Sequence, residues 1–203
     1  MIANHIHDAL GQVRRLQELI LEKRKFTGYS GTARMLSGTV TMLGCVAMGF
    51  HTGSQGVLLA GWVSILLVAL LLNYGALLLW YIQLPTGRRK VATISPALDA
   101  VPPLVIGAIL SAALLLRGYP DLLFGTWMCL YGLAHTNCRT ALPKENWFLG
   151  IYYMVCGTFF MLWQGASFMN PLPVGLVFLV GEWVGGTIFY RHKIEAMQEA
   201  EDE

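Results

Sequence analysis

Glu182 is the residue of this 203-residue chain whose surroundings most clearly demand a chemical explanation. It lies deep in an apolar run, residues 172–190, that is long enough to cross a bilayer. An ionised carboxylate is costly in such a place, so Glu182 must be protonated, paired with a cation or turned toward a wet cavity. Gly181 and Gly185 form a GxxxG spacing around it, which lets a second helix pack closely. Glu182 is therefore predicted either to bind a ligand or a proton, or only to join helices through hydrogen bonds.

Other polar residues fall on the same side of the membrane as Glu182 if the apolar runs are helices of alternating direction. Asn73 has a similar depth in the second run, and His135 ends the fourth run on that side. Arg34 and Asp99 each begin a run there, and they are predicted either to form an ion pair or to extend separately to the membrane surface. We therefore predict an inward-facing polar pocket as a ligand or proton site, with the candidate residues Glu182, Asn73, Tyr74, His135, Asp99 and Arg34.

No catalytic motif accompanies these residues. A Gly-rich phosphate loop, HExxH, GxSxG and a carboxylate pair on one helix are all missing from the sequence. His51 and His135 end runs on opposite sides, so they cannot share a haem, and the four cysteines form no CxxC pair. We predict a protein without enzymatic activity, cofactor or metal, and without direct contact to nucleic acid, because no basic cluster alternates with aromatic residues.

Six apolar runs must position the polar candidates. Apolar residues make up 55% of the chain and charged residues 13%, about half of the share usual in soluble proteins, roughly 25%. The runs are residues 33–50, 57–82, 97–116, 122–134, 147–167 and 172–190, and the fourth is short for a membrane span. Tyrosines and tryptophans at run ends, Tyr152 and Tyr153 among them, are typical of an interfacial belt. Because no window alternates with period two, we predict an all-α bundle of six transmembrane helices.

Basic residues predict how the bundle is oriented. Every Lys and Arg except Arg117 lies in the N-terminal segment, the second or fourth connection or the C-terminal tail. Because cytoplasmic loops are enriched in these residues, the chain is predicted to be a multi-pass protein of the inner (plasma) membrane with both termini in the cytoplasm.

The chain also carries a weak internal similarity. Residues 36–39 (Leu-Ser-Gly-Thr) resemble residues 123–126 (Leu-Phe-Gly-Thr), and the third and sixth runs both begin near a Ser-Pro or Asn-Pro pair. A three-helix unit repeated once would have inverted topology, as in many transporters. Chance similarity among common membrane residues is the open alternative.

The first 30 residues form a separate amphipathic region. Residues 6–26 place apolar side chains on one helical face, and the basic residues on the other side are Arg14, Arg15, Lys23, Arg24 and Lys25. Such a helix is predicted to lie on the lipid bilayer, or to dock a cytosolic regulatory protein or a second copy of the chain. We divide the chain into this region (1–30), the transmembrane domain (31–190) and a charged cytoplasmic tail (191–203), whose acidic end is a candidate partner of the basic face.

Three stretches of the chain resemble a family of bacterial six-helix inner-membrane proteins with an amphipathic N-terminal helix and no assigned activity. The stretches are residues 21–38, 124–135 and 175–186. The resemblance implies the bacterial inner membrane and the architecture predicted above. Such proteins are encoded near small winged-helix regulators, which implies a sensing or signalling role. No catalytic residue follows from the resemblance.

Three functional hypotheses remain. The first is a non-enzymatic protein that senses a small ligand within the bundle and signals to a cytosolic partner through the N-terminal helix. The alternative is a small-solute or proton-coupled transporter or channel that uses Glu182. The third, an enzyme acting on lipid, is disfavoured because the sequence offers neither a nucleophile with its base nor a metal set.

Overall fold

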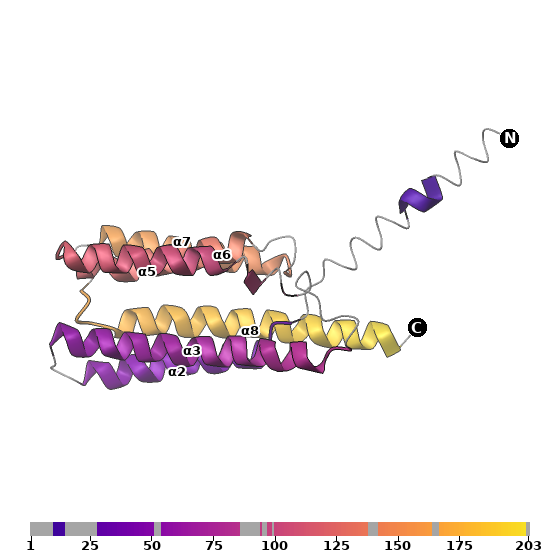
Figure 1. The fold of residues 1–203 in the computed structure, drawn as a ribbon, viewed down its shortest axis with the longest axis horizontal. Helices are drawn as coiled ribbons and strands as arrows, with labels where there is room; N and C mark the ends of the chain where they lie inside the picture. The colour runs from indigo at the N-terminus through magenta and orange to yellow at the C-terminus, as the bar shows by residue number, and fades with distance from the viewer. Residues whose placement is uncertain are drawn as a thin grey trace.

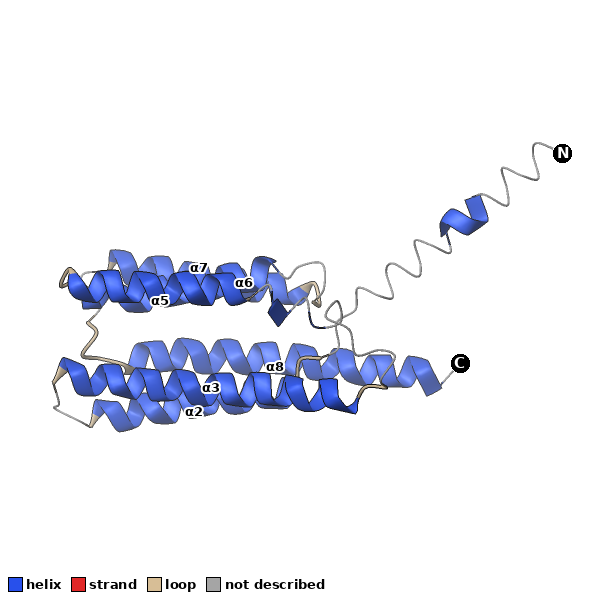
Figure 2. Ribbon diagram, in the orientation of Figure 1, coloured by secondary structure: helices blue, strands red, loops and turns tan. Residues whose placement is uncertain are grey.

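The computed structural model describes residues 10–14, 28–50, 54–85, 94, 97–98, 100–137, 142–163 and 167–201. Helices and short connections account for all of these residues, and none of them is in a strand (Figure 2). The all-α prediction is therefore confirmed for the described parts of the chain.

Each of the six predicted runs contains a helix in the described residues. The helices are α2 (Gly31–Gly49), α3 (Gln55–Gln83), α5 (Val101–Leu116), α6 (Leu123–Asn137), α7 (Glu145–Leu162) and α8 (Leu172–Glu201), with a 3-10 turn η2 (Pro120–Leu122) before α6. Ser30 caps α2 through its side chain, which accepts a hydrogen bond from the backbone N–H of Ala33 at 3.2 Å. α5 begins later than the predicted residue 97, because Pro102 and Pro103 fit only the first turn of a helix. Of the predicted amphipathic helix over residues 6–26, residues 10–14 are described and helical.

The helices form two groups that do not follow the two halves of the chain. α2, α3 and α8 lie together, and α5, α6 and α7 form the second group (Figure 1). Each half thus contributes its third helix, α5 or α8, to the group formed by the other half. This is the grouping that an inverted repeat with an exchanged third helix would produce. The repeat stays a prediction, because α2 packs mainly on α8 whereas its counterpart α6 packs mainly on α7.

Glycines set the closest helix contact in the second group. A Cβ added at Gly125 would lie 2.7 Å from the carbonyl oxygen of Gly157, and one added at Gly132 would lie 2.6 Å from that of Gly150. These distances are too short for any side chain, so the backbones of α6 and α7 touch along this seam. Gly125, early in α6, faces Gly157, late in α7, whereas the later Gly132 faces the earlier Gly150. The two helices are therefore antiparallel.

Two described helices are long and apolar enough to cross a membrane, α3 and the Leu172–Glu195 part of α8. This suggests membrane association only weakly, since a core helix of a soluble protein can meet the same criterion. α5 is apolar, but its 16 residues span about 24 Å, less than the roughly 30 Å of a bilayer core. The prediction of six transmembrane helices is therefore not confirmed: among the described helices, two have spanning character.

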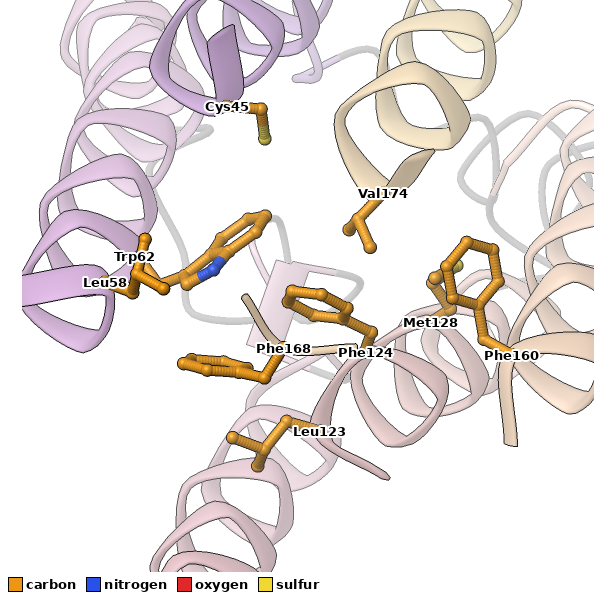
Figure 3. Close-up of a cluster of buried hydrophobic side chains, with 9 residues drawn as sticks. All are labelled: Cys45, Leu58, Trp62, Leu123, Phe124, Met128, Phe160, Phe168 and Val174. Atoms are coloured by element: carbon orange, nitrogen blue, oxygen red, sulfur yellow. The ribbon is translucent and has the colours of Figure 1, made fainter. Parts of the chain in front are cut away.

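An aromatic cluster joins the two groups near the C-terminal end of α2 (Figure 3). Phe124 of α6 is its centre, with the ring of Trp62 from α3 at 5.2 Å and that of Phe168 at 5.3 Å between centroids. Asp121 holds the segment before α8 in place, because its carboxylate accepts a hydrogen bond from the backbone N–H of Phe168 at 2.6 Å. The members of the aromatic cluster are Cys45, Leu58, Trp62, Leu123, Phe124, Met128, Phe160, Phe168 and Val174.

Candidate functional site

A buried ion pair joins the first and last helices of the described bundle. The Nε of Arg34 on α2 donates to Oε2 of Glu182 on α8 at 2.9 Å, and its Nη2 donates to Oε1 at 3.3 Å. The two residues are 6% and 3% exposed, so water does not screen this pair. A bidentate contact of this kind is the strongest arrangement that a guanidinium and a carboxylate adopt.

Two tyrosines from the other helix group complete the coordination of the carboxylate. The hydroxyl of Tyr131 on α6 donates to Oε1 of Glu182 at 2.9 Å, and that of Tyr153 on α7 donates to the same oxygen at 2.8 Å. Their rings also contact each other edge to face, with centroids 4.9 Å apart. Glu182 is therefore stabilised as an anion by one cation and two neutral donors, and it connects both groups.

The guanidinium likewise reaches across to the second group. Nη1 of Arg34 donates to Oδ1 of Asn146 at 3.2 Å, and Nη2 lies in hydrogen-bond contact with Nε2 of His135. Asn146 in turn donates from Nδ2 to the carbonyl oxygen of His135 at 3.3 Å. We call the six residues the polar network; they are Arg34, Tyr131, His135, Asn146, Tyr153 and Glu182.

The polar network fixes the tautomer of His135. A guanidinium has only donors, so Nε2 of His135 must accept the hydrogen bond from Arg34. The ring proton then sits on Nδ1, which donates to the carbonyl oxygen of Tyr131 at 2.9 Å. His135 is thus neutral, and its one ring N–H donates a hydrogen bond to a backbone carbonyl oxygen.

Glycines around Glu182 make room for the polar network. A Cβ added at Gly185 would lie 2.5 Å from Cζ of Arg34, and one at Gly38 would lie 2.6 Å from Cβ of Glu182. A Cβ at Gly181 would collide with the hydroxyl of Tyr153. Gly181 and Gly185 were predicted to admit a neighbouring helix; the atoms nearest to them are instead the side chains of the site.

Three of the six predicted site residues meet in the polar network. They are Arg34, His135 and Glu182. Asn73 donates from Nδ2 to the carbonyl oxygen of Ala69 at 2.9 Å within α3, and Tyr74 follows it as a half-buried residue of the same helix. The predicted pair of Arg34 with Asp99 falls outside the described residues, and the carboxylate beside Arg34 is that of Glu182. Among the basic candidates, Arg14 lies in an exposed helical stretch, and those outside the described residues are Arg15, Lys23, Arg24 and Lys25.

Sequence reasoning missed Tyr131, Asn146 and Tyr153. Tyr153 was assigned to an interfacial belt, but it is completely buried, and Asn146 is only 1% exposed. Tyr131 carried a usable signal, because it precedes His135 by one helical turn and so shares its face. Tyr153 and Asn146 also lie seven residues apart on one face of α7, which is the heptad spacing of buried positions.

A cavity of about 320 Å³ lies beside the polar network. Residues 30–32 at the start of α2 line it together with Phe189, Lys193 and Met197 of α8. Phe189 lines this cavity, and its ring centroid lies 5.5 Å from Cζ of Arg34. Among the described residues, no three His, Cys, Asp or Glu side chains gather in a way that could hold a metal ion.

Comparisons with known proteins do not assign the chain to a family. No sequence model of a protein family matches the chain, and no curated protein or solved structure is significantly similar to it.

Proposed function

We propose that the protein is an integral membrane protein of the bacterial inner membrane, with six spanning helices and cytoplasmic termini. The distribution of polarity supports this proposal. Leu71, Leu79 and Leu116 are 73%, 63% and 88% exposed, whereas the charges of Arg34 and Glu182 are buried. A lipid-facing surface explains an apolar exterior around a polar interior better than water does. The resemblance to a bacterial six-helix family agrees with this proposal.

Within this setting, we propose that the protein is non-enzymatic and couples the state of its bundle to a cytosolic partner. The observation that carries the proposal is that one buried ion pair joins α2 and α8 and also bonds to α6 and α7. α2 and α8 are the helices that lead directly into the two predicted cytoplasmic segments. A change at the pair therefore acts on both segments and on the second helix group at once.

The polar network suits a two-state element. A ligand or proton that neutralises Glu182 removes the counter-ion of Arg34, and a buried unpaired guanidinium is unstable. The helices must then rearrange to give Arg34 another anion or water. Because each member is bonded to at least one other, the polar network opens as a unit and not gradually.

The coupling is tested by Glu182→Gln in inside-out membrane vesicles. The amide keeps the size of the side chain but removes the charge that balances Arg34. We expect a several-fold change in the rate at which trypsin cleaves at the basic residues of the 1–27 segment. Asn73→Ala is the matched control, because Asn73 is a polar helix residue bonded within α3.

An unchanged cleavage rate in folded Glu182→Gln, with the size-exclusion profile of the unmodified chain, would refute the coupling. The partner is tested separately: a cytosolic protein co-purified in mild detergent from the native host should be lost when residues 1–27 are deleted. Its retention would remove the N-terminal segment from the proposed pathway.

A second candidate is proton-coupled transport through Glu182. The grouping of helices favours it, since each chain half gives its third helix to the other group, as expected of an exchanged inverted repeat. Purified protein in liposomes should then move protons or solute down a gradient, and Glu182→Gln should abolish this flux. Equal flux in both proteins would exclude the carboxylate from transport.

A further inference from the structure

The donors around Glu182 form a complete set of contacts for a carboxylate. Nε and Nη2 of Arg34 lie 2.9 and 3.3 Å from its two oxygens, and the hydroxyls of Tyr131 and Tyr153 donate at 2.9 and 2.8 Å. The planar fork of a guanidinium matches the two oxygens of a carboxylate. The side chain of Glu182 occupies this set of donors, and a free carboxylate offers the same atoms to them.

The charge balance of the buried site restricts what can join Glu182 there. The titratable groups that face its carboxylate are Arg34 of α2, Tyr131 and His135 of α6 and Tyr153 of α7. Only Arg34 among them is charged, so the cation and the carboxylate cancel. An anion alone would leave one excess negative charge, and a proton alone would leave one excess positive charge. Both are costly in a site where Arg34 and Glu182 are 6% and 3% exposed.

We propose that the ligand of the polar network is a short carboxylic acid, which enters undissociated and transfers its proton to Glu182. The O–H bond of the acid breaks, a new O–H bond forms on the carboxylate of Glu182, and the resulting anion pairs with the guanidinium of Arg34. The sum of the buried charges stays at zero. This inference rests on the proposed function, because it names the ligand that changes the state of the polar network.

The packing of the site favours a small acid. A Cβ added at Gly185 would lie 2.5 Å from Cζ of Arg34, and one added at Gly38 would lie 2.6 Å from Cβ of Glu182. Because not even one further carbon fits at these positions, we assign the site to acids of the size of formic or acetic acid.

The cavity of about 320 Å³ is a place from which such an acid can approach. Phe189 lines it, and the centroid of this ring lies 5.5 Å from Cζ of Arg34. Lys193 also lines it, and its positive charge attracts the oxygens of an acid, whereas Ile194 and Met197 give it an apolar wall for the hydrocarbon part.

Infrared difference spectroscopy of the full-length protein in liposomes tests the proton transfer. Acetic acid labelled with ¹³C is added at a constant pH of about 5, where a carboxylic acid is partly undissociated. We expect a new carbonyl band of a protonated, unlabelled carboxyl group, and the label separates this band from that of the added acid. The band should be absent in Glu182→Gln and present in the matched control Asn73→Ala, whose side chain bonds within α3.

Glu182→Ala provides a second readout, because the fragment that it removes has the size of acetate. At pH 7 acetate should protect this variant from denaturing detergent several-fold better than chloride at equal ionic strength. The double variant Arg34→Met/Glu182→Met, which lacks the cation, should show no difference between the two anions.

Three outcomes overturn the proposal. They are the absence of the new band in the unmodified protein, the same band in Glu182→Gln, and a band that appears with dodecanoic acid but not with acetic acid, which assigns the site to a fatty acid of the bilayer. The cleavage assay of the coupling is independent of these results. A changed cleavage rate in Glu182→Gln without the infrared band refutes the acid and keeps the coupling, whereas the band with unchanged cleavage does the reverse.

Discussion

The polar network and the aromatic cluster are two solutions to the same task, since both connect the group of α2, α3 and α8 to the group of α5, α6 and α7. The aromatic cluster relies on packing, which is non-directional and loses its contribution in proportion to the atoms removed. The polar network relies on directed bonds among charged and polar groups, so the loss of one partner leaves another buried without compensation. The comparison teaches that the aromatic cluster is suited to hold the groups together and the polar network to switch between states.

Even the aromatic cluster contains one polar group that lacks a partner. The indole N–H of Trp62 is buried without a hydrogen-bond acceptor among the described residues, although Trp62 is only 7% exposed. The neighbouring Trp127, by contrast, donates from Nε1 to Oγ of Ser111 at 2.8 Å. The cluster tolerates the unpaired N–H because its surrounding rings pack closely enough to outweigh the loss of one hydrogen bond.

The largest expected effect is that of Glu182→Ala. It leaves Arg34 buried and unpaired, which should lower the free energy of unfolding in detergent by about 3–5 kcal/mol. The double variant Arg34→Met/Glu182→Met removes both charges and should recover most of this stability. Unfolding curves in a titration with denaturing detergent measure both effects. A double variant as unstable as Glu182→Ala would show that the charges are needed for the fold and do not only switch it.

The next effect is expected from Phe124→Ala at the centre of the aromatic cluster. It removes ring contacts with Trp62 and Phe168 and leaves a cavity. In lipid the transfer of an apolar side chain adds little, so the loss should be about 2–3 kcal/mol, below that of the same change in a soluble core. Phe124→Leu is the control and should lose less than half as much. Unlike Glu182→Gln, neither variant should alter the cleavage rate of the N-terminal segment.

Tyr153→Phe should have a smaller effect on stability. It removes one of two tyrosine donors to Glu182, while Tyr131 and Arg34 still bond the carboxylate. A hydrogen bond between membrane helices contributes about 0.6 kcal/mol on average and at most roughly 1.7, so a loss of about 1 kcal/mol is expected. The same detergent titration applies, and a loss as large as that of Glu182→Ala would show that the polar network does not tolerate a missing donor.

The smallest effect concerns a surface contact on the predicted cytoplasmic side. Nε2 of His192 lies 3.2 Å from Oε2 of Glu145, and both side chains are half exposed. Backbone N–H at the start of α7 and the contact with His192 lower the pKa of Glu145 below its usual range. A carboxyl with a lowered pKa stabilises the fold above its unfolded pKa, near 4.3, and loses this contribution as the pH falls below that value. Glu145→Gln should thus lower the free energy of unfolding by less than about 1 kcal/mol at pH 7 and by nothing measurable at pH 3. Thermal unfolding at the two pH values measures this difference.

The sequence predicted the six helices well, because long apolar runs between breakers have few alternatives in three dimensions. It also identified Glu182, Arg34 and His135, since ionisable residues in apolar runs are conspicuous. The start of α5 was placed too early, because the effect of Pro102 and Pro103 was not weighed.

It was harder to predict which residues contact one another than to predict which residues belong to the site. Depth along a helix can be counted from the sequence, but rotation about the helix axis and the choice of neighbour cannot. Asn73 shares the predicted depth of Glu182 and yet bonds within its own helix, whereas Tyr153 was assigned to the membrane surface and lies completely buried. The sequence also could not show that α8 lies with α2 and α3, because this depends on packing between residues far apart in the chain.

The pairing of α2 with α8 affects how the protein must be made. Arg34 and Glu182 are 148 residues apart, so a ribosome that adds about 5–20 residues per second completes the last helix roughly 7–30 s after the first. If α2 lies in a bilayer as proposed, the guanidinium lacks Glu182 during that interval and stays at the headgroup level or pairs with an anionic lipid. The contact between Arg34 and Glu182 therefore forms only after nearly the whole chain has been made, and a chain stalled before α8 would leave Arg34 without this partner.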